Sequence, residues 1–180
     1  MGRIMLVGSA VFGLGAAIAG YVWVAFEFPW IIIVPATLGW YAVCRMRFDQ
    51  ATALKAGAVG GVLFTVAFMV SMFLAITDGS PVALPSWLGP IAAAGIAGAV
   101  VGAMLGKVKG AGVGGLYSAV GMSAAVVVMA LTRDLAPAAT QQPGSAQSMW
   151  VAAMLLVVGA LVGASAGAVV HKIAEQSEAA

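Results

Sequence analysis

Long runs without a charged side chain constrain the possible fold of this chain more than any other feature of its sequence. The first run extends from Ile4 to Phe26, and comparable runs precede Asp78, Lys107, Arg133 and Lys172. At about 1.5 Å per helical residue, a run of some 20 residues crosses the roughly 30 Å hydrocarbon core of a bilayer. Lipid offers no hydrogen bonds to the backbone, so such runs are expected to be helical. We therefore predict an all-α integral membrane protein.

The composition agrees with this prediction and excludes several classes of function. Hydrophobic residues make up 63% of the chain and charged residues 8%, and the mean hydropathy is +1.08. The net charge of +2 leaves no basic face for nucleic acid, so no nucleic-acid partner is expected. A single cysteine, Cys44, and a single histidine, His171, exclude an internal disulfide and any Cys- or His-rich metal site. We expect no metal and no cofactor.

The uncharged runs predict six transmembrane helices. A signal peptide is an alternative for the first, but its apolar run continues past the small residues at 17–19. The second is short, about 22 Å for some 15 residues, and Pro35 should remove one hydrogen bond within it. A re-entrant segment is the alternative there, although the charge distribution favours a crossing. The expected helices cover residues 4–26, 30–44, 51–76, 87–107, 112–132 and 148–170.

Positive charges predict the orientation of these helices. Arg133 alone falls at one set of helix ends, and the remaining Lys and Arg residues fall at the other. By the positive-inside rule, both termini are cytoplasmic and the 135–147 loop is outside a plasma or inner membrane. The residues at the cytoplasmic ends are Arg3, Arg45, Arg47, Lys55, Lys107, Lys109 and Lys172.

A glycine stripe recurs in the sequence and indicates an internal repeat. Six of nine residues are identical between 98–106 and 159–167, and the lysine-led segment at 55–61 resembles 109–115. Glycine every fourth residue allows close helix packing in lipid. The alternative is a chance alignment of two Ala/Gly/Val-rich helices. If the hairpin is duplicated, the two stripes should either meet or occupy equivalent places around a pseudo-symmetry axis. The stripe glycines are Gly98, Gly102, Gly106, Gly159, Gly163 and Gly167.

The expected organisation is one membrane domain over residues 1–180. It divides into hairpins at 1–48, 49–108 and 109–171, and a cytoplasmic tail at 172–180 follows.

Catalytic and ion-coupled chemistry is disfavoured. A formal dinucleotide fingerprint at 110–115 lacks the preceding strand that it requires. No ionisable group lies in the middle of an expected span, which argues against a proton pump unless Glu27, Asp78 or Asp134 at the outer mouth takes part. No nucleophile, base and acid can be assembled from the chain, so we do not expect an enzyme.

Four hydroxyl-bearing residues are the candidate binding residues: Thr37, Thr65, Tyr117 and Ser118. Such hydroxyls commonly bond to their own helix or to a neighbouring helix. The alternative is a site near the midplane for a neutral or weakly polar solute.

Two functions follow from these observations. The first is a small protein of transport or channel type that handles a neutral or weakly polar solute. The second is a non-catalytic accessory or scaffold subunit that packs its glycine faces against copies of itself or other membrane subunits. Substituting Gly102 and Gly163 with Leu separates the two, since loss of a partner from a folded chain favours the second.

Overall fold

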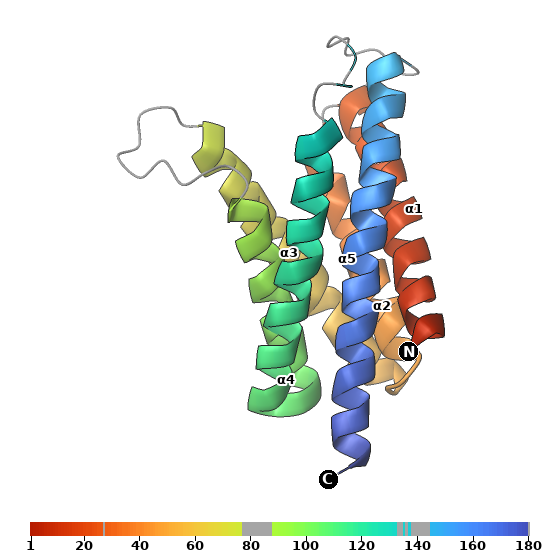
Figure 1. Ribbon diagram of the computed structural model, residues 1–180, viewed down its shortest axis with the longest axis vertical. Helices are drawn as coiled ribbons and strands as arrows, with labels where there is room; N and C mark the ends of the chain where they lie inside the picture. Colours follow the sequence, from red (N-terminus) through yellow and green to blue (C-terminus); the bar gives the residue numbers. More distant parts are fainter. Residues whose placement is uncertain (27, 77–87, 133–134, 136, 138–144, 180) are drawn as a thin grey trace.

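The computed structural model describes residues 1–26, 28–76, 88–132, 135, 137 and 145–179. In these ranges all regular structure is helical, and the helices run along one long axis (Figure 1). Four helices are long and apolar enough to cross a membrane, and a shorter apolar helix covers Trp30–Arg45. The elements are α1 (Gly2–Phe26), η1 (Pro29–Ile32), α2 (Ile33–Arg45), α3 (Gln50–Ile76), α4 (Leu88–Thr132) and α5 (Ala146–Glu178).

Helix α4 folds back on itself, so two of the expected helices form one continuous element. Its 45 residues would measure about 68 Å if straight, more than twice the hydrocarbon core. The helical backbone breaks at Gly106 (φ −139°, ψ 22°) and Lys107 (φ 55°, ψ −143°). We call residues 88–105 the first arm and residues 108–132 the second arm, and Figure 1 shows the two arms side by side. The expected loop at 108–111 is helical instead, because Gly106 and Lys107 complete the reversal two residues earlier.

The second predicted helix is short, and it begins with a 3-10 turn. Helix α2 has 13 residues, and η1 precedes it directly. Pro35 is the third residue of α2, within the first turn, where backbone N–H groups lack a partner in their own helix. Because η1 continues directly into α2, Pro35 is the sixth residue of the apolar helical segment Trp30–Arg45, and the loss of one hydrogen bond there stays a prediction.

Helix α5 is longer than predicted at both ends. The Ser145 hydroxyl accepts a hydrogen bond from the Ser148 backbone N–H and caps the helix, which starts at Ala146. At the other end the predicted tail is helical to Glu178. Ile173 in this segment is fully buried, so packing against the bundle extends the helix.

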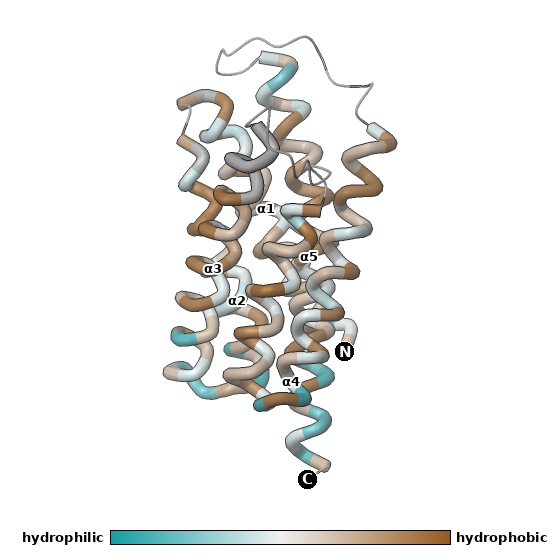
Figure 2. Tube along the Cα trace, turned by 90° about the vertical axis from the view of Figure 1, so that its left-hand side faces the viewer, coloured by the Kyte–Doolittle hydropathy of each residue, from teal (hydrophilic) through white to brown (hydrophobic). Residues whose placement is uncertain are grey.

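The helices form a closed bundle in which sequence neighbours are also spatial neighbours. Helix α1 contacts α2, α2 contacts α3, α3 contacts α4, and α4 contacts α5. Helix α5 returns to pack against α1 in the most extensive contact of the fold. Figure 2 shows hydrophobic residues along the length of the bundle and hydrophilic ones gathered at the end where both termini lie.

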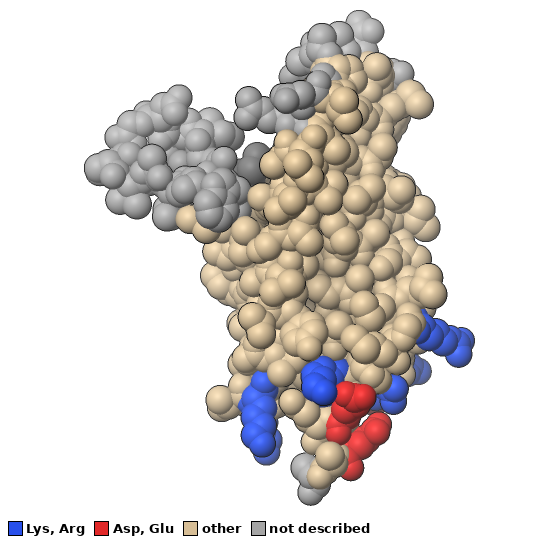
Figure 3. Space-filling view, viewed as in Figure 1, with Lys and Arg blue, Asp and Glu red and all other residues tan. Residues whose placement is uncertain are grey.

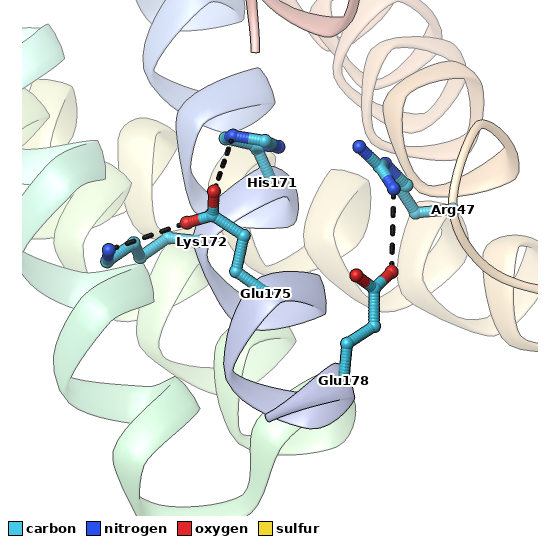
Figure 4. Close-up of polar contacts among 5 residues, drawn as sticks. All are labelled: Arg47, His171, Lys172, Glu175 and Glu178. Atoms are coloured by element: carbon cyan, nitrogen blue, oxygen red, sulfur yellow. Dashed lines mark hydrogen bonds and ion pairs between the residues drawn. The ribbon is translucent and has the colours of Figure 1, made fainter. Parts of the chain in front are cut away.

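The described Lys and Arg residues lie at that same end, which we call the charged end. On the face shown in Figure 3, their atoms and those of the described acidic residues lie there. Figure 4 shows Arg47 paired with Glu178 at 3.6 Å, and His171 paired with Glu175 at 3.1 Å. The pair of Arg47 and Glu178 is exposed, and an exposed pair of this kind adds little stability. Four charged residues that the sequence places at the outer ends of the helices lie outside the described residues. They are Arg133, Glu27, Asp78 and Asp134.

Candidate functional site

A partly open apolar cavity of about 300 Å³ lies between the helices of the bundle. Every helix contributes to its wall, and both arms of α4 do so. Most of the lining residues come from the half of each helix that lies away from the charged end, and Phe12, Trp40, Ala97 and Ser118 lie near the middle of their helices. The lining residues are Phe12, Ala16, Trp23, Ile32, Pro35, Ala36, Trp40, Phe64, Phe68, Pro90, Ala94, Ala97, Ser118, Met122, Met129, Leu155, Val158, Gly159 and Val162.

Small residues leave room for the cavity between closely packed helices. Ala94 and Ala97 face the interior from the first arm of α4 and are 3% and 1% exposed. Gly159 faces it from α5, and a Cβ there would overlap the Phe12 carbonyl of α1. The helices therefore approach closely, yet short side chains at these positions do not fill the centre.

A packed core closes the cavity toward the charged end. The rings of Phe12 and Trp40 form the end of the cavity nearest the charged end, which we call the floor. They pack edge to face, with ring centroids 6.3 Å apart and planes at 83°. Both belong to a buried cluster that continues toward the charged end through Val43, Val101 and Val169, each 0% exposed. A solute in the cavity would therefore be separated from the charged end by several layers of side chains.

The lining has almost no polar chemistry. Among the lining residues none carries a charge, Ser118 alone carries a hydroxyl, and Trp23 and Trp40 each carry an indole N–H. Aromatic rings provide much of the wall, including Phe64 and Phe68, which stack at 5.9 Å. Burying a charge in such a wall without a partner is strongly unfavourable, so the cavity suits a neutral occupant.

The structure separates the four predicted binding residues. Ser118 is 3% exposed and lines the cavity. Thr37 lies against Gly61 at the α2–α3 contact. Thr65 is 1% exposed and does not line the cavity, and Tyr117 is 36% exposed on the outside of the bundle. Tyr117 and Ser118 are consecutive, about 100° apart on the helix, so they cannot face the same interior point.

The two glycine stripes pack inside the chain, each against a helix that runs in the opposite direction. A Cβ added to Gly98 or Gly102 would overlap backbone of Gly114 or Gly110 in the second arm of α4. Gly106 faces Ile173. The second stripe packs on α1, where Gly159 faces Phe12, Gly163 faces Gly8 and Gly167 faces Met5.

The sequence gives no signal for most of the cavity wall. Trp23, Phe64 and Met129 are apolar residues in apolar helices, and nothing in their spacing separates a cavity wall from a packed core. Ser118 was identifiable because a hydroxyl within a long apolar run stands out.

Catalytic or metal-binding groups do not cluster in the part of the chain that the structure describes. There, no three side chains of His, Cys, Asp or Glu lie close enough to hold a metal ion. Cys44 is 0% exposed within the core cluster, and His171 lies at the charged end, away from the cavity. Comparisons with protein-family models, curated proteins and solved structures find no match to this chain.

Proposed function

We propose that this chain is a carrier-type membrane protein that crosses a plasma or inner membrane six times, with both termini in the cytoplasm. Its interior cavity binds a neutral, mostly apolar solute from the outer half of the membrane. The cavity that every helix lines is the observation that carries this proposal.

The path of the chain supports six crossings. The two arms of α4 are antiparallel and meet at Lys107, and η1 with α2 forms a further short segment. The described Lys and Arg residues lie at one end of all these segments, which by the positive-inside rule faces the cytoplasm. The cavity then lies in the outer half.

The packed floor supports a carrier rather than an open channel. A channel needs a continuous path, whereas Phe12, Trp40 and the cluster beyond them fill the cytoplasmic half of the bundle. A solute bound in the cavity would leave toward the cytoplasm only if the helices moved apart, as in alternating access.

The accessory-subunit alternative draws less support from the structure. It rests on the near absence of functional polar groups and on an excess of surface for helix contacts, including the glycine faces. Gly102 and Gly163, however, contact backbone of the same chain at Gly110 and Gly8. A partner subunit would have to use other surfaces.

Binding of a small arene tests the proposal. Radiolabelled naphthalene is equilibrated with the protein in lipid nanodiscs, and saturable binding is measured against empty nanodiscs. The Ala94→Phe variant places a ring in the cavity, so we expect it to lose saturable binding. Ala92→Phe is the matched control because Ala92 lies two residues away on the exposed face of α4, and it should bind as the natural protein does.

The same measurement can contradict the proposal. No saturable binding to the natural protein, or equal binding to both variants, would mean that the cavity does not hold a solute. Size-exclusion profiles of the two variants should match and establish that both are folded.

A further inference from the structure

We propose that the cavity takes one unbranched hydrocarbon chain of about twelve carbons, and that the solute is therefore a single-chain lipid. The chain enters from the outer half of the membrane, with its methyl end at the floor and its polar head outside the cavity. This inference rests on the proposed function, since it names the class of solute that the same cavity holds.

The cavity is long and narrow, and its long dimension follows the helices. Its lining extends from Phe12 to Trp23 in α1 and from Ser118 to Met129 in the second arm of α4. Each interval corresponds to about 16 Å along a helix. A volume of about 300 Å³ over this length leaves a mean cross-section of about 18 Å², or a width of about 5 Å. Such a width suits a methylene chain, whose carbon atoms contact their neighbours at about 4 Å.

The volume and the length of the cavity indicate the same chain. An apolar cavity of about 150 Å³ holds one benzene molecule, which has six carbons. A cavity of about 300 Å³ therefore holds about twelve carbons. Carbon–carbon bonds of about 1.5 Å, set in a zigzag, give an extended chain of this size a length of about 14 Å. This length agrees with the extent of the lining along α1 and α4.

The two ends of the cavity differ in how deeply they are buried. Phe12 and Trp40 at the floor are 6% and 5% exposed, and the packed cluster lies beyond them. Trp23, Phe68 and Met129, at the end away from the floor, are only partly buried. This difference favours an opening at the outer end. A long occupant then inserts end-on, and whatever group it carries at its other end stays outside.

The chemistry of the wall suits a saturated chain. Apart from Ser118 and the indole N–H groups of Trp23 and Trp40, the lining side chains carry no polar group. The Ser118 Oγ is itself buried against Gly98 and does not reach the occupant. Methylene groups need no hydrogen bond, whereas an occupant rich in polar groups would leave them unpaired in this wall.

A series of 1-alkanols tests the length of the inferred chain. Each alcohol, from 1-hexanol to 1-hexadecanol, competes with radiolabelled naphthalene in nanodiscs, and its concentration is expressed as a mole fraction of the membrane lipid. We expect competition to strengthen by about 10-fold or more from 1-hexanol to 1-dodecanol, because a short chain leaves part of the cavity empty. Beyond 1-dodecanol it should strengthen no further. A steady increase to 1-hexadecanol, or no dependence on length, would overturn the inference.

A pair of alcohols with equal numbers of carbons tests the width of the cavity. In 1-decanol the carbons form a chain, and in 1-adamantanol they form a compact cage. We expect 1-decanol to displace naphthalene and 1-adamantanol to displace it at least about 10-fold more weakly, since a cage wider than the cavity would have to force the helices apart. Equal displacement by the two alcohols would show that the cavity does not select a chain.

A longer side chain near the floor should shorten the preferred chain. Ala97 is 1% exposed and is the innermost lining residue of the first arm of α4. In Ala97→Leu we expect the length at which competition stops strengthening to fall by about three carbons, the number that the substitution adds. Ala103→Leu adds the same atoms at an exposed position of the same arm and should leave this length unchanged. An unchanged length in a folded Ala97→Leu variant would contradict the inserted chain.

The results distinguish this inference from the proposed function. Failure of naphthalene to bind the natural protein would refute the proposed function. Saturable binding of naphthalene that no 1-alkanol displaces would overturn the inserted chain and leave the binding cavity in place. Size-exclusion profiles establish whether the two variants are folded. If Ala97→Leu does not fold, the alcohol series on the natural protein decides by itself.

Discussion

At the scale of single residues, Lys107 shows how one position can determine the path of the chain. It is the one non-glycine residue with positive φ among the residues that the structure describes. Its φ of 55° with ψ of −143° is a conformation that side chains with a Cβ disfavour, at a cost of about 1–3 kcal/mol. The close approach of Gly102 and Gly110 on either side holds the turn in this geometry.

Replacing Lys107 with glycine should therefore stabilise the protein. We expect Lys107→Gly to raise the free energy of unfolding by about 1 kcal/mol, because glycine adopts positive φ without steric conflict. Thermal or denaturant unfolding in detergent measures the change. Lys109→Gly removes the same charge at a residue of α4 with ordinary helical backbone, and it should be destabilising. An equal effect of both substitutions would show that charge, rather than backbone geometry, is responsible.

At the scale of helices, the two glycine stripes have equivalent partners. The stripe of the first arm of α4 packs on the second arm, and the stripe of α5 packs on α1. In both cases a helix that runs toward the charged end contacts one that runs away from it. The nearest neighbours of each stripe lie on its partner helix or, for Gly106, at Ile173, and no glycine of the other stripe is among them. A pseudo-symmetry axis that relates the two stripes stays a prediction.

Adding a single methyl group to a stripe should separate these helices. A Cβ at Gly163 would overlap the Gly8 carbonyl of α1, and backbone cannot move aside as a side chain can. We expect Gly163→Ala to lower the free energy of unfolding by about 1–3 kcal/mol.

Gly112→Ala is the control for Gly163→Ala, because a Cβ at Gly112 would meet nothing within 4 Å. It should be neutral or slightly stabilising, since alanine is the better helix former. Unfolding in detergent compares the two variants. Similar stabilities would contradict the close contact between α1 and α5.

At the scale of the whole molecule, the charge distribution and the helix directions together define two ends. Gln50 and Val108 lie at the charged end, and Val108 is 88% exposed. Leu135 follows the second arm of α4 at the opposite end and is 72% exposed. Six crossings with both termini in the cytoplasm would place these residues on different sides of the membrane.

Single cysteines at these positions test the arrangement. In a Cys44→Ala background, we expect a membrane-impermeant maleimide to label Leu135→Cys in intact cells, because this site faces outward. Gln50→Cys and Val108→Cys should be labelled only after the cells are permeabilised, because both sites face the cytoplasm. Labelling of Gln50→Cys from outside would show either that η1 and α2 do not cross or that the orientation is reversed.

The helical class of this protein, its membrane-length apolar helices, the short second helix and the positive charge at one end were all predictable from the sequence. Uncharged runs in lipid leave the backbone little alternative to a helix, so these features follow from local composition. The length of the loop at Lys107 and the extension of α5 depended on contacts between helices, such as the burial of Ile173.

The residues that line the cavity could not be predicted from the sequence, because they are brought together by the packing of all the helices. The cavity requires short side chains, such as Ala94 and Ala97, to face large ones, such as Trp40 and Phe64, from different helices. A hydrophobic pattern that continues around every helix does not reveal which face points inward. Tyr117 and Ser118 were therefore equivalent candidates in sequence, and the rotation of one helix placed Ser118 at the cavity and Tyr117 on the outer surface.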